Sequence, residues 1–267
     1  MTELASGKLV LDRPADAVAR LTIRNPGKRN ALDHEILDAI ATAMADLDDG
    51  IETRCVIIQG SKGMFSAGYD IGDIPDEVFA EEAERLVAHP FSRAIEAVER
   101  FPFPTLAAIN GHALGGGLEL AVTCDLRVAA AGMKLGMPPA KLGLIYSHTG
   151  IQKFLDTVGA ARTRELFFIG RNVTAERAEE INLVHETVPR DDIERHAVEI
   201  AVEIAANAPV SLNGNKRIIT ELLTFPRLSE KLEREVIELR LSSFRTEDFR
   251  EGVRAFGEKR KPRWQGR

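Results

Sequence analysis

The chain has 267 residues, of which 44% are hydrophobic and 28% are charged, a composition typical of a soluble globular protein. Its formal net charge is −6 and its pI is about 5.6, which argues against a nucleic-acid-binding protein because such proteins usually present a basic surface. The two cysteines, Cys55 and Cys124, lie in apolar runs and predict small core residues in a reducing cytoplasm, not a disulfide framework.

The N-terminal part of the chain predicts a hairpin, a helix and a buried strand. Residues 8–11 and 18–23 are short apolar runs separated by turn composition, which indicates two paired strands. Asn-Pro-Gly from residue 25 predicts a loop, and apolar residues near helical spacing predict a helix at about 33–48. The apolar run 55–58 is typical of a buried strand. The N-terminus lacks a signal-peptide pattern, and no segment is apolar enough to predict a membrane span.

The remainder alternates strands with helices and then becomes helical. A helix is expected over 77–100, with a break at Pro90. Further strands are expected at residues 105–109, 126–130, 134–136 and 184–186. Helices dominate from about residue 151, so the pattern predicts an α/β core over 1–190 and a helical C-terminal region over 191–267.

The stretch 104–125 combines a strand, a tight turn and a glycine-rich helix start. Gly115, Gly116 and Gly117 lead into a helical pattern, and the first N–H groups of a helix have no partner within it. The helix dipole also favours negative charge there, so the pattern suits an anion site. Glu119 lies one turn after Gly116 and shares its face. Close helix packing is the alternative explanation of the glycines.

The loop 61–70 is the second candidate. Gly68 next to Tyr69 suggests an unusual turn with exposed N–H groups, whereas an ordinary surface loop is the alternative that the loop alone favours. His112 is predicted to be structural. His148 lies near a helix start and is predicted to be a solvated or capping loop residue, with contact to substrate as the alternative.

Four segments in order resemble the crotonase (enoyl-CoA hydratase/isomerase) superfamily. They are NPGKRNAL at 25–32, FSAGYDI at 65–71, NGHALGGGLE at 110–119 followed by Cys124-Asp125, and AERAEEINLV at 175–184. The resemblance covers nearly the whole chain. It implies an α/β (α+β) spiral of β-β-α units with a helical C-terminal trimerisation region, assembled as trimers or dimers of trimers.

The resemblance also implies an oxyanion hole. By position, the backbone N–H groups of Tyr69 and Gly116 would hold the thioester oxygen of an acyl-CoA and stabilise an enolate, and donors of this kind are each worth about 2.7–4 kcal/mol. The other substrate or CoA contacts that it implies are Lys28, Ala67, Gly68, Asp70, Ile71, Pro138 and Lys259. Asp70 is also a candidate brace for its loop, and Lys259 a residue of a solvated basic tail. Because paired His or Cys spacing is absent, no metal is expected, and no cofactor beyond the substrate's CoA.

Members of the family differ in whether a second acidic residue accompanies the one that matches Glu119. The hydratases resemble one another in using two glutamates, of which one matches Glu119 and the other would fall at Pro139, which carries no acid. A paired-carboxylate mechanism is therefore incomplete. Glu119 with Tyr146 resembles instead the methylmalonyl-CoA decarboxylase branch, although the member most like this chain has His where this sequence has Tyr69.

Three hypotheses follow. The favoured one is decarboxylation of a short malonyl-type thioester such as methylmalonyl-CoA, with Tyr146 holding the leaving carboxylate. A raised pKa of Glu119 is expected in that case, because a charged Glu119 would repel the substrate. The second is hydration of a 2-enoyl-CoA with Glu119 as the single acid/base. The third is a non-catalytic acyl-CoA-binding protein. All three expect a cytoplasmic protein with neither nucleic acid nor membrane as partner.

Overall fold

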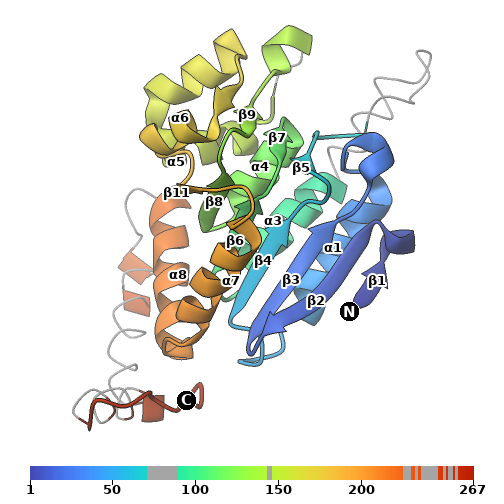
Figure 1. The fold of residues 1–267 in the computed structure, drawn as a ribbon. Helices are drawn as coiled ribbons and strands as arrows, with labels where there is room; N and C mark the ends of the chain where they lie inside the picture. Colours follow the sequence, from blue (N-terminus) through green and yellow to red (C-terminus); the bar gives the residue numbers. More distant parts are fainter. Residues whose placement is uncertain are drawn as a thin grey trace.

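The computed structural model describes residues 1–70, 90–142, 146–224, 230–231, 234–235, 246–248, 251, 255 and 258–267. Its described strands form two sheets (Figure 1). The large sheet contains, in spatial order, β1 (Thr2–Leu4), β2 (Leu9–Ala15), β3 (Val18–Ile23), β4 (Cys55–Gln59), β6 (Thr105–Ile109), β8 (Leu126–Ala130) and β11 (Glu186–Val188). The small sheet contains β10 (Val173–Thr174), β9 (Lys134–Gly136), β7 (His112–Leu114) and β5 (Met64–Ser66). Both sheets are mixed, with antiparallel pairs at one end and parallel pairs through the rest.

The chain winds through the two sheets as a spiral. Each turn places one strand in the large sheet and the next in the small sheet, and then a helix follows (Figure 1). The successive turns are β4–β5–α3 (Ser92–Arg100), β6–β7–α4 (Gly116–Thr123) and β8–β9–α5 (His148–Arg164). The predicted α/β spiral of β-β-α units is therefore confirmed.

The remaining described helices complete the layers. They are η1 (Ala5–Gly7), η2 (Pro26–Lys28), α1 (His34–Asp46), η5 (Pro139–Leu142), η6 (Glu165–Ile169), α6 (Ala175–Glu180), α7 (Ile193–Ala205) and α8 (Pro209–Thr224). No helix in the described ranges is long and apolar enough to cross a membrane.

The large sheet is covered on both faces, and the alternation along β4 shows how. Val56 and Ile58 belong to the larger apolar cluster that includes α1 and α3. Cys55 and Ile57 face the other way and pack with α7. Because successive side chains of a strand point to opposite faces, a strand with both faces buried is a continuous apolar run. Cys55 and Cys124 are both buried and unpaired, as predicted, and burial raises the pKa of each thiol to about 12.

The C-terminal helix α8 is joined to the core by a buried lysine. Lys216 is 9% exposed, and its ammonium donates to Asp125 Oδ2 at 2.7 Å and to the Phe103 carbonyl at 3.0 Å. Asp125 also accepts from the Thr105 N–H at 2.7 Å. The ion pair thus links α8 to the start of β6 and the end of α4.

Most long elements agree with the sequence analysis. The hairpin is confirmed as β2 and β3, and the predicted helix at 33–48 is α1, capped by Asp33, which accepts from the Ile36 N–H at 2.9 Å. The last predicted strand is displaced: it begins at Glu186, because the Val184 N–H is still bonded to Ala178 O in the turn after α6. The predicted helix at 77–100 is described only from residue 90 onward.

Candidate active site

The start of α4 supplies one backbone donor. The chain reaches it through Gly115, whose φ is +53° and whose N–H donates to Gly136 O at 2.9 Å. Gly116 is the first residue of the helix, so its N–H has no acceptor within the helix. Gly117 lets the helix approach β5, because a Cβ there would lie 2.6 Å from Ser66 O. The structure therefore fixes the direction of the Gly116 N–H with backbone contacts.

The loop after β5 supplies the other donor. Leu32 N–H donates to Gly68 O at 2.8 Å, and Asp70 N–H donates to Leu32 O at 3.0 Å. Because the two residues flanking Tyr69 make these bonds, the N–H of Tyr69 itself points away from Leu32. Gly68 has a φ of +99°, and a Cβ on it would lie 3.2 Å from the Gly116 nitrogen. The backbone at 68–69 and the first residue of α4 are thus neighbours.

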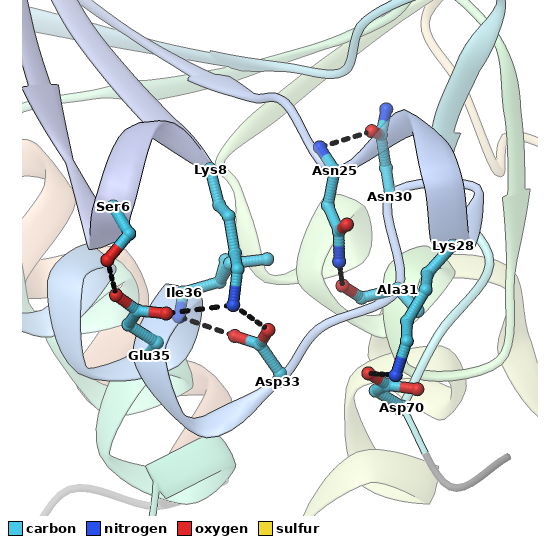
Figure 2. Close-up of polar contacts among 10 residues, drawn as sticks. All are labelled: Ser6, Lys8, Asn25, Lys28, Asn30, Ala31, Asp33, Glu35, Ile36 and Asp70. Atoms are coloured by element: carbon cyan, nitrogen blue, oxygen red, sulfur yellow. Dashed lines mark hydrogen bonds and ion pairs between the residues drawn. The ribbon is translucent and has the colours of Figure 1, made fainter. Parts of the chain in front are cut away.

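A buried asparagine holds the turn that precedes β5. Asn30 is fully buried, and its side-chain NH₂ donates to Ser61 O at 3.0 Å and to Met64 O at 2.6 Å. Its Oδ1 accepts from the Asn25 N–H at 2.9 Å (Figure 2). Asn30 therefore joins the loop after β3 to the two ends of the turn that precedes β5.

Two of the predicted CoA-binding residues pair with each other. Lys28 donates to Asp70 Oδ2 at 2.8 Å, with side chains 43% and 13% exposed (Figure 2). A third, Ala67, donates its N–H to Arg29 O at 3.1 Å. These contacts place Lys28, Ala67 and Asp70 in the same two loops that carry the Tyr69 donor.

The predicted acid/base residue ends a chain of hydroxyl groups. Tyr146 donates its hydroxyl to Glu119 Oε2, and the hydroxyl of Tyr69 lies 3.2 Å from that of Tyr146. Glu119 is 2% exposed and Tyr146 is 9% exposed. The structure thus brings Tyr69, Glu119 and Tyr146 together from the loop after β5, from α4 and from the segment before α5.

Burial governs the electrostatics of this group. Burial raises the pKa of Glu119, and the Tyr146 hydroxyl, the Lys153 ammonium and the Tyr69 hydroxyl partly oppose that rise. Lys153 is itself paired with Glu99 at 2.8 Å. Burial also raises the pKa of both tyrosines, so their hydroxyls remain protonated donors at neutral pH.

The first turn of α5 covers the carboxyl group from the other side. Ser147 caps this helix by accepting from the Gly150 N–H at 3.1 Å. A Cβ on Gly150 would lie 2.7 Å from the Tyr146 ring and 2.9 Å from Glu119 Oε1. Gly150 is therefore required by packing, which the sequence analysis did not anticipate. Asn30 was also missed, because the two carbonyl groups that accept from its side chain are more than 30 residues away in the chain.

Several other predicted residues have defined places. Pro138 follows β9 and is half-buried, and Pro139 begins η5, so no carboxyl group stands at position 139. His112 Nδ1 accepts from the Lys134 N–H at 2.9 Å, which is a structural role. Ile71 lies outside the described residues.

Lys259 is not brought to this group. It is exposed in the C-terminal segment 258–267, which lies at the opposite end of the molecule from β5 and β7 (Figure 1). A cavity of about 1210 Å³ borders α4, α5, α6 and α8; it is lined by His148, Lys153 and Glu99 among others, but by none of Tyr69, Gly116, Glu119 and Tyr146. Within the described residues, no three His, Cys, Asp or Glu side chains gather to hold a metal ion.

Comparison with known proteins agrees with this geometry. The family model described as enoyl-CoA hydratase/isomerase matches residues 13–267. The chain is 36% identical over 256 residues to a protein of Bacillus subtilis named "Probable enoyl-CoA hydratase", covering 93% of this chain and 95% of that one. It is 32% identical over 247 residues to the short-chain-enoyl-CoA hydratase of Clostridium acetobutylicum, covering 91% and 92%.

A solved structure shows the same fold. The enoyl-CoA hydratase of Bacillus anthracis superposes with a TM-score of 0.89 at 30% sequence identity, covering 97% of this chain and 100% of that one. The chain belongs to the enoyl-CoA hydratase/isomerase family, the crotonase superfamily. These relatives carry hydratase names, and none of the comparisons supports methylmalonyl-CoA decarboxylase in particular.

Proposed function

We propose that this protein hydrates a short 2-enoyl-CoA thioester, with Glu119 as its single acid/base. The N–H groups of Tyr69 and Gly116 would bind the thioester oxygen and stabilise the enolate. The Tyr69 N–H points away from its bridge partner Leu32, and the Gly116 N–H has no acceptor within its helix. Glu119 would take one proton from water as the oxygen adds to C3, and would return that proton to C2. The atoms balance without a second carboxyl group.

The observation that carries this proposal is the hydroxyl of Tyr146 donated to Glu119. Hydration uses this pair as it stands, because a donor on the carboxylate stabilises the base in a buried place. Decarboxylation would require the same hydroxyl to turn to a substrate carboxylate. Glu119, which is 2% exposed, would then lose its donor beside a second negative charge. The names of the relatives also support hydration.

Decarboxylation of a malonyl-type thioester stays the second candidate. Its specific support is Pro139, which leaves the place of the second hydratase acid without a carboxyl group. A raised pKa of Glu119 is also favourable, since a neutral carboxyl group would tolerate a substrate carboxylate.

Mass spectrometry of products separates the two. Purified protein is incubated separately with crotonyl-CoA and with methylmalonyl-CoA. We expect a gain of one water from the first and no loss of CO₂ from the second. Glu119→Gln should reduce hydration by about 10²–10⁴-fold, the usual contribution of a general acid/base. Glu96→Gln, an exposed residue on α3, is the matched control and should leave the rate unchanged. Loss of CO₂ alone would reverse the assignment.

Assembly and location are also proposals. We propose that the region 191–267 mediates a homotrimer, or a dimer of trimers, of a cytoplasmic protein. In support, α8 exposes Ile219, Leu222 and Leu223 at 58%, 48% and 53%, on one side of the helix, and grouped exposed apolar side chains often mark a protein–protein interface. Light scattering after size exclusion tests it, and a monomer at micromolar concentration would overturn it.

A further inference from the structure

The Tyr69 side chain has no role in the oxyanion hole, which uses only its backbone. Its ring nevertheless occupies a defined place. It packs edge-on against Phe91, with ring centroids 4.7 Å apart and an interplanar angle of 85°. It also covers the start of α4, because a Cβ on Gly116 would lie 2.5 Å from a ring carbon. One residue therefore reaches both the oxyanion donors and the carboxyl group of Glu119.

We infer that Tyr69 is a positioning residue whose hydroxyl donates to Tyr146 Oη and so keeps the Tyr146 hydrogen on Glu119. This inference rests on the proposed role of Glu119 as acid/base. It assigns a function to the Tyr69 side chain that is separate from its backbone N–H.

The number of hydrogens that each group can donate sets the donor and acceptor roles among Tyr69, Tyr146 and Glu119. Each phenol has one hydrogen to donate, and an ionised carboxylate can only accept. Tyr146 donates its hydrogen to Glu119, so a hydrogen bond across the 3.2 Å contact between the two hydroxyls can only be donated by Tyr69. The ionised state is therefore served by two donors in series, and each donor polarises the next. When Glu119 takes a proton, it becomes a donor itself, and the constraint on the two hydroxyls is released.

The surroundings of Glu119 allow this effect to be isolated. The groups that act on its carboxyl are Tyr146 before α5, Tyr69 after β5, Lys153 on α5 and Glu99 on α3. The last two are paired with each other at 2.8 Å, and they act on the pKa of Glu119 in opposite directions. The two tyrosine hydroxyls are therefore the groups whose removal can be used to change the pKa of Glu119.

The test is Tyr69→Phe, which keeps the ring and the backbone N–H and removes only the hydroxyl. Because a donor to the ionised form is weakened, the pKa of Glu119 should rise. The acid limb of kcat/KM for crotonyl-CoA should move to higher pH, with a loss of about two- to tenfold on the acid side, as expected for one hydrogen bond. The rate well above that limb should change little.

An infrared titration of the free protein reads the same group without turnover. The band of the protonated carboxyl group is assigned by its absence in Glu119→Gln. Tyr146→Phe should move its midpoint further than Tyr69→Phe, in the same direction. Thr42→Val is the matched control, because Thr42 lies on α1 and donates its hydroxyl to Asp38 O, away from the groups that act on Glu119; it should leave the midpoint unchanged.

The outcomes are distinct. If Tyr69→Phe leaves both the infrared midpoint and the acid limb at their original pH while Tyr146→Phe moves them, the inference is wrong. If the unmodified protein does not hydrate crotonyl-CoA but the infrared midpoint moves in Tyr69→Phe, hydration fails as a function and the positioning role of Tyr69 stands.

Discussion

The two segments that supply the proposed oxyanion donors are held in different ways. Around Gly116 the position is set by regular structure: a strand, a turn and a helix start, with the Gly115 N–H bonded to β9. Around Tyr69 it is set by the distant loop at 25–32, whose backbone bonds to residues 67, 68 and 70 and whose Asn30 side chain holds the turn before β5. The first donor therefore depends on glycine at a few positions, whereas the second depends on residues far away in the sequence.

The largest effect should come from adding a side chain at Gly116. A Cβ there would lie 2.5–3.0 Å from three atoms of the Tyr69 ring, so Gly116→Ala must displace that ring, and we expect the Tyr69 N–H to move with it. We expect kcat/KM for crotonyl-CoA to fall by about 10²–10³-fold, the cost of one oxyanion donor. Steady-state kinetics measure the effect, and circular dichroism confirms that the fold is kept.

The control for Gly116→Ala is Gly27→Ala. Nothing lies within 4 Å of a Cβ at Gly27, so this variant should match the unmodified protein. Activity of Gly116→Ala within twofold of that control would show that the two donors are not coupled through the Tyr69 ring.

In the second segment, the largest loss of stability should come from a substitution at Asn30. Asn30→Ala removes the bonds to Ser61 O, Met64 O and the Asn25 N–H, and leaves these backbone groups without this partner in a buried place. The residue also has a φ of +55°, which Asn tolerates better than Ala. We expect the free energy of unfolding to fall by about 2–4 kcal/mol, measured by urea denaturation.

Asn207→Ala provides the comparison for Asn30→Ala. Asn207 is exposed and follows α7, and its side chain donates to Glu203 O in the last turn of that helix, so its loss should cost less than about 0.5 kcal/mol. Equal stability of the two variants would mean that Asn30 does not hold the turn before β5.

The same contrast explains what the sequence could predict. The Gly116 segment is encoded locally: an apolar run, Asn-Gly, three glycines and an apolar helix, so strand, turn and helix were all predicted. The Gly68-Tyr69 turn was suggested only weakly by its own residues, and the resemblance was needed to favour it. The strands β5 and β7 have three residues each, too few to show a period of two.

The long-range side-chain contacts could not be predicted from the sequence. Tyr69 and Tyr146 are 77 residues apart, and Lys216 meets Asp125 across 91 residues. Nothing in either neighbourhood specifies the partner, because these contacts form only when the spiral closes. Glu119 was predicted from its spacing to Gly116, but its burial and its bond to Tyr146 are properties of the packed site.

The smallest effects should come from the ion pair between Lys28 and Asp70, and they separate two roles of Lys28. As a brace, the pair is partly exposed, so Lys28→Met and Asp70→Asn should each cost less than about 1 kcal/mol of unfolding free energy. As a phosphate contact, only the lysine matters. We therefore expect Lys28→Met to raise the KM for crotonyl-CoA about two- to fivefold relative to Asp70→Asn, the worth of one exposed charge contact. This excess should shrink at high salt, because exposed charges are screened. Equal KM values in the two variants would restrict Lys28 to bracing the loop. The 25–32 segment would then position the Tyr69 donor without contacting the CoA phosphates through Lys28.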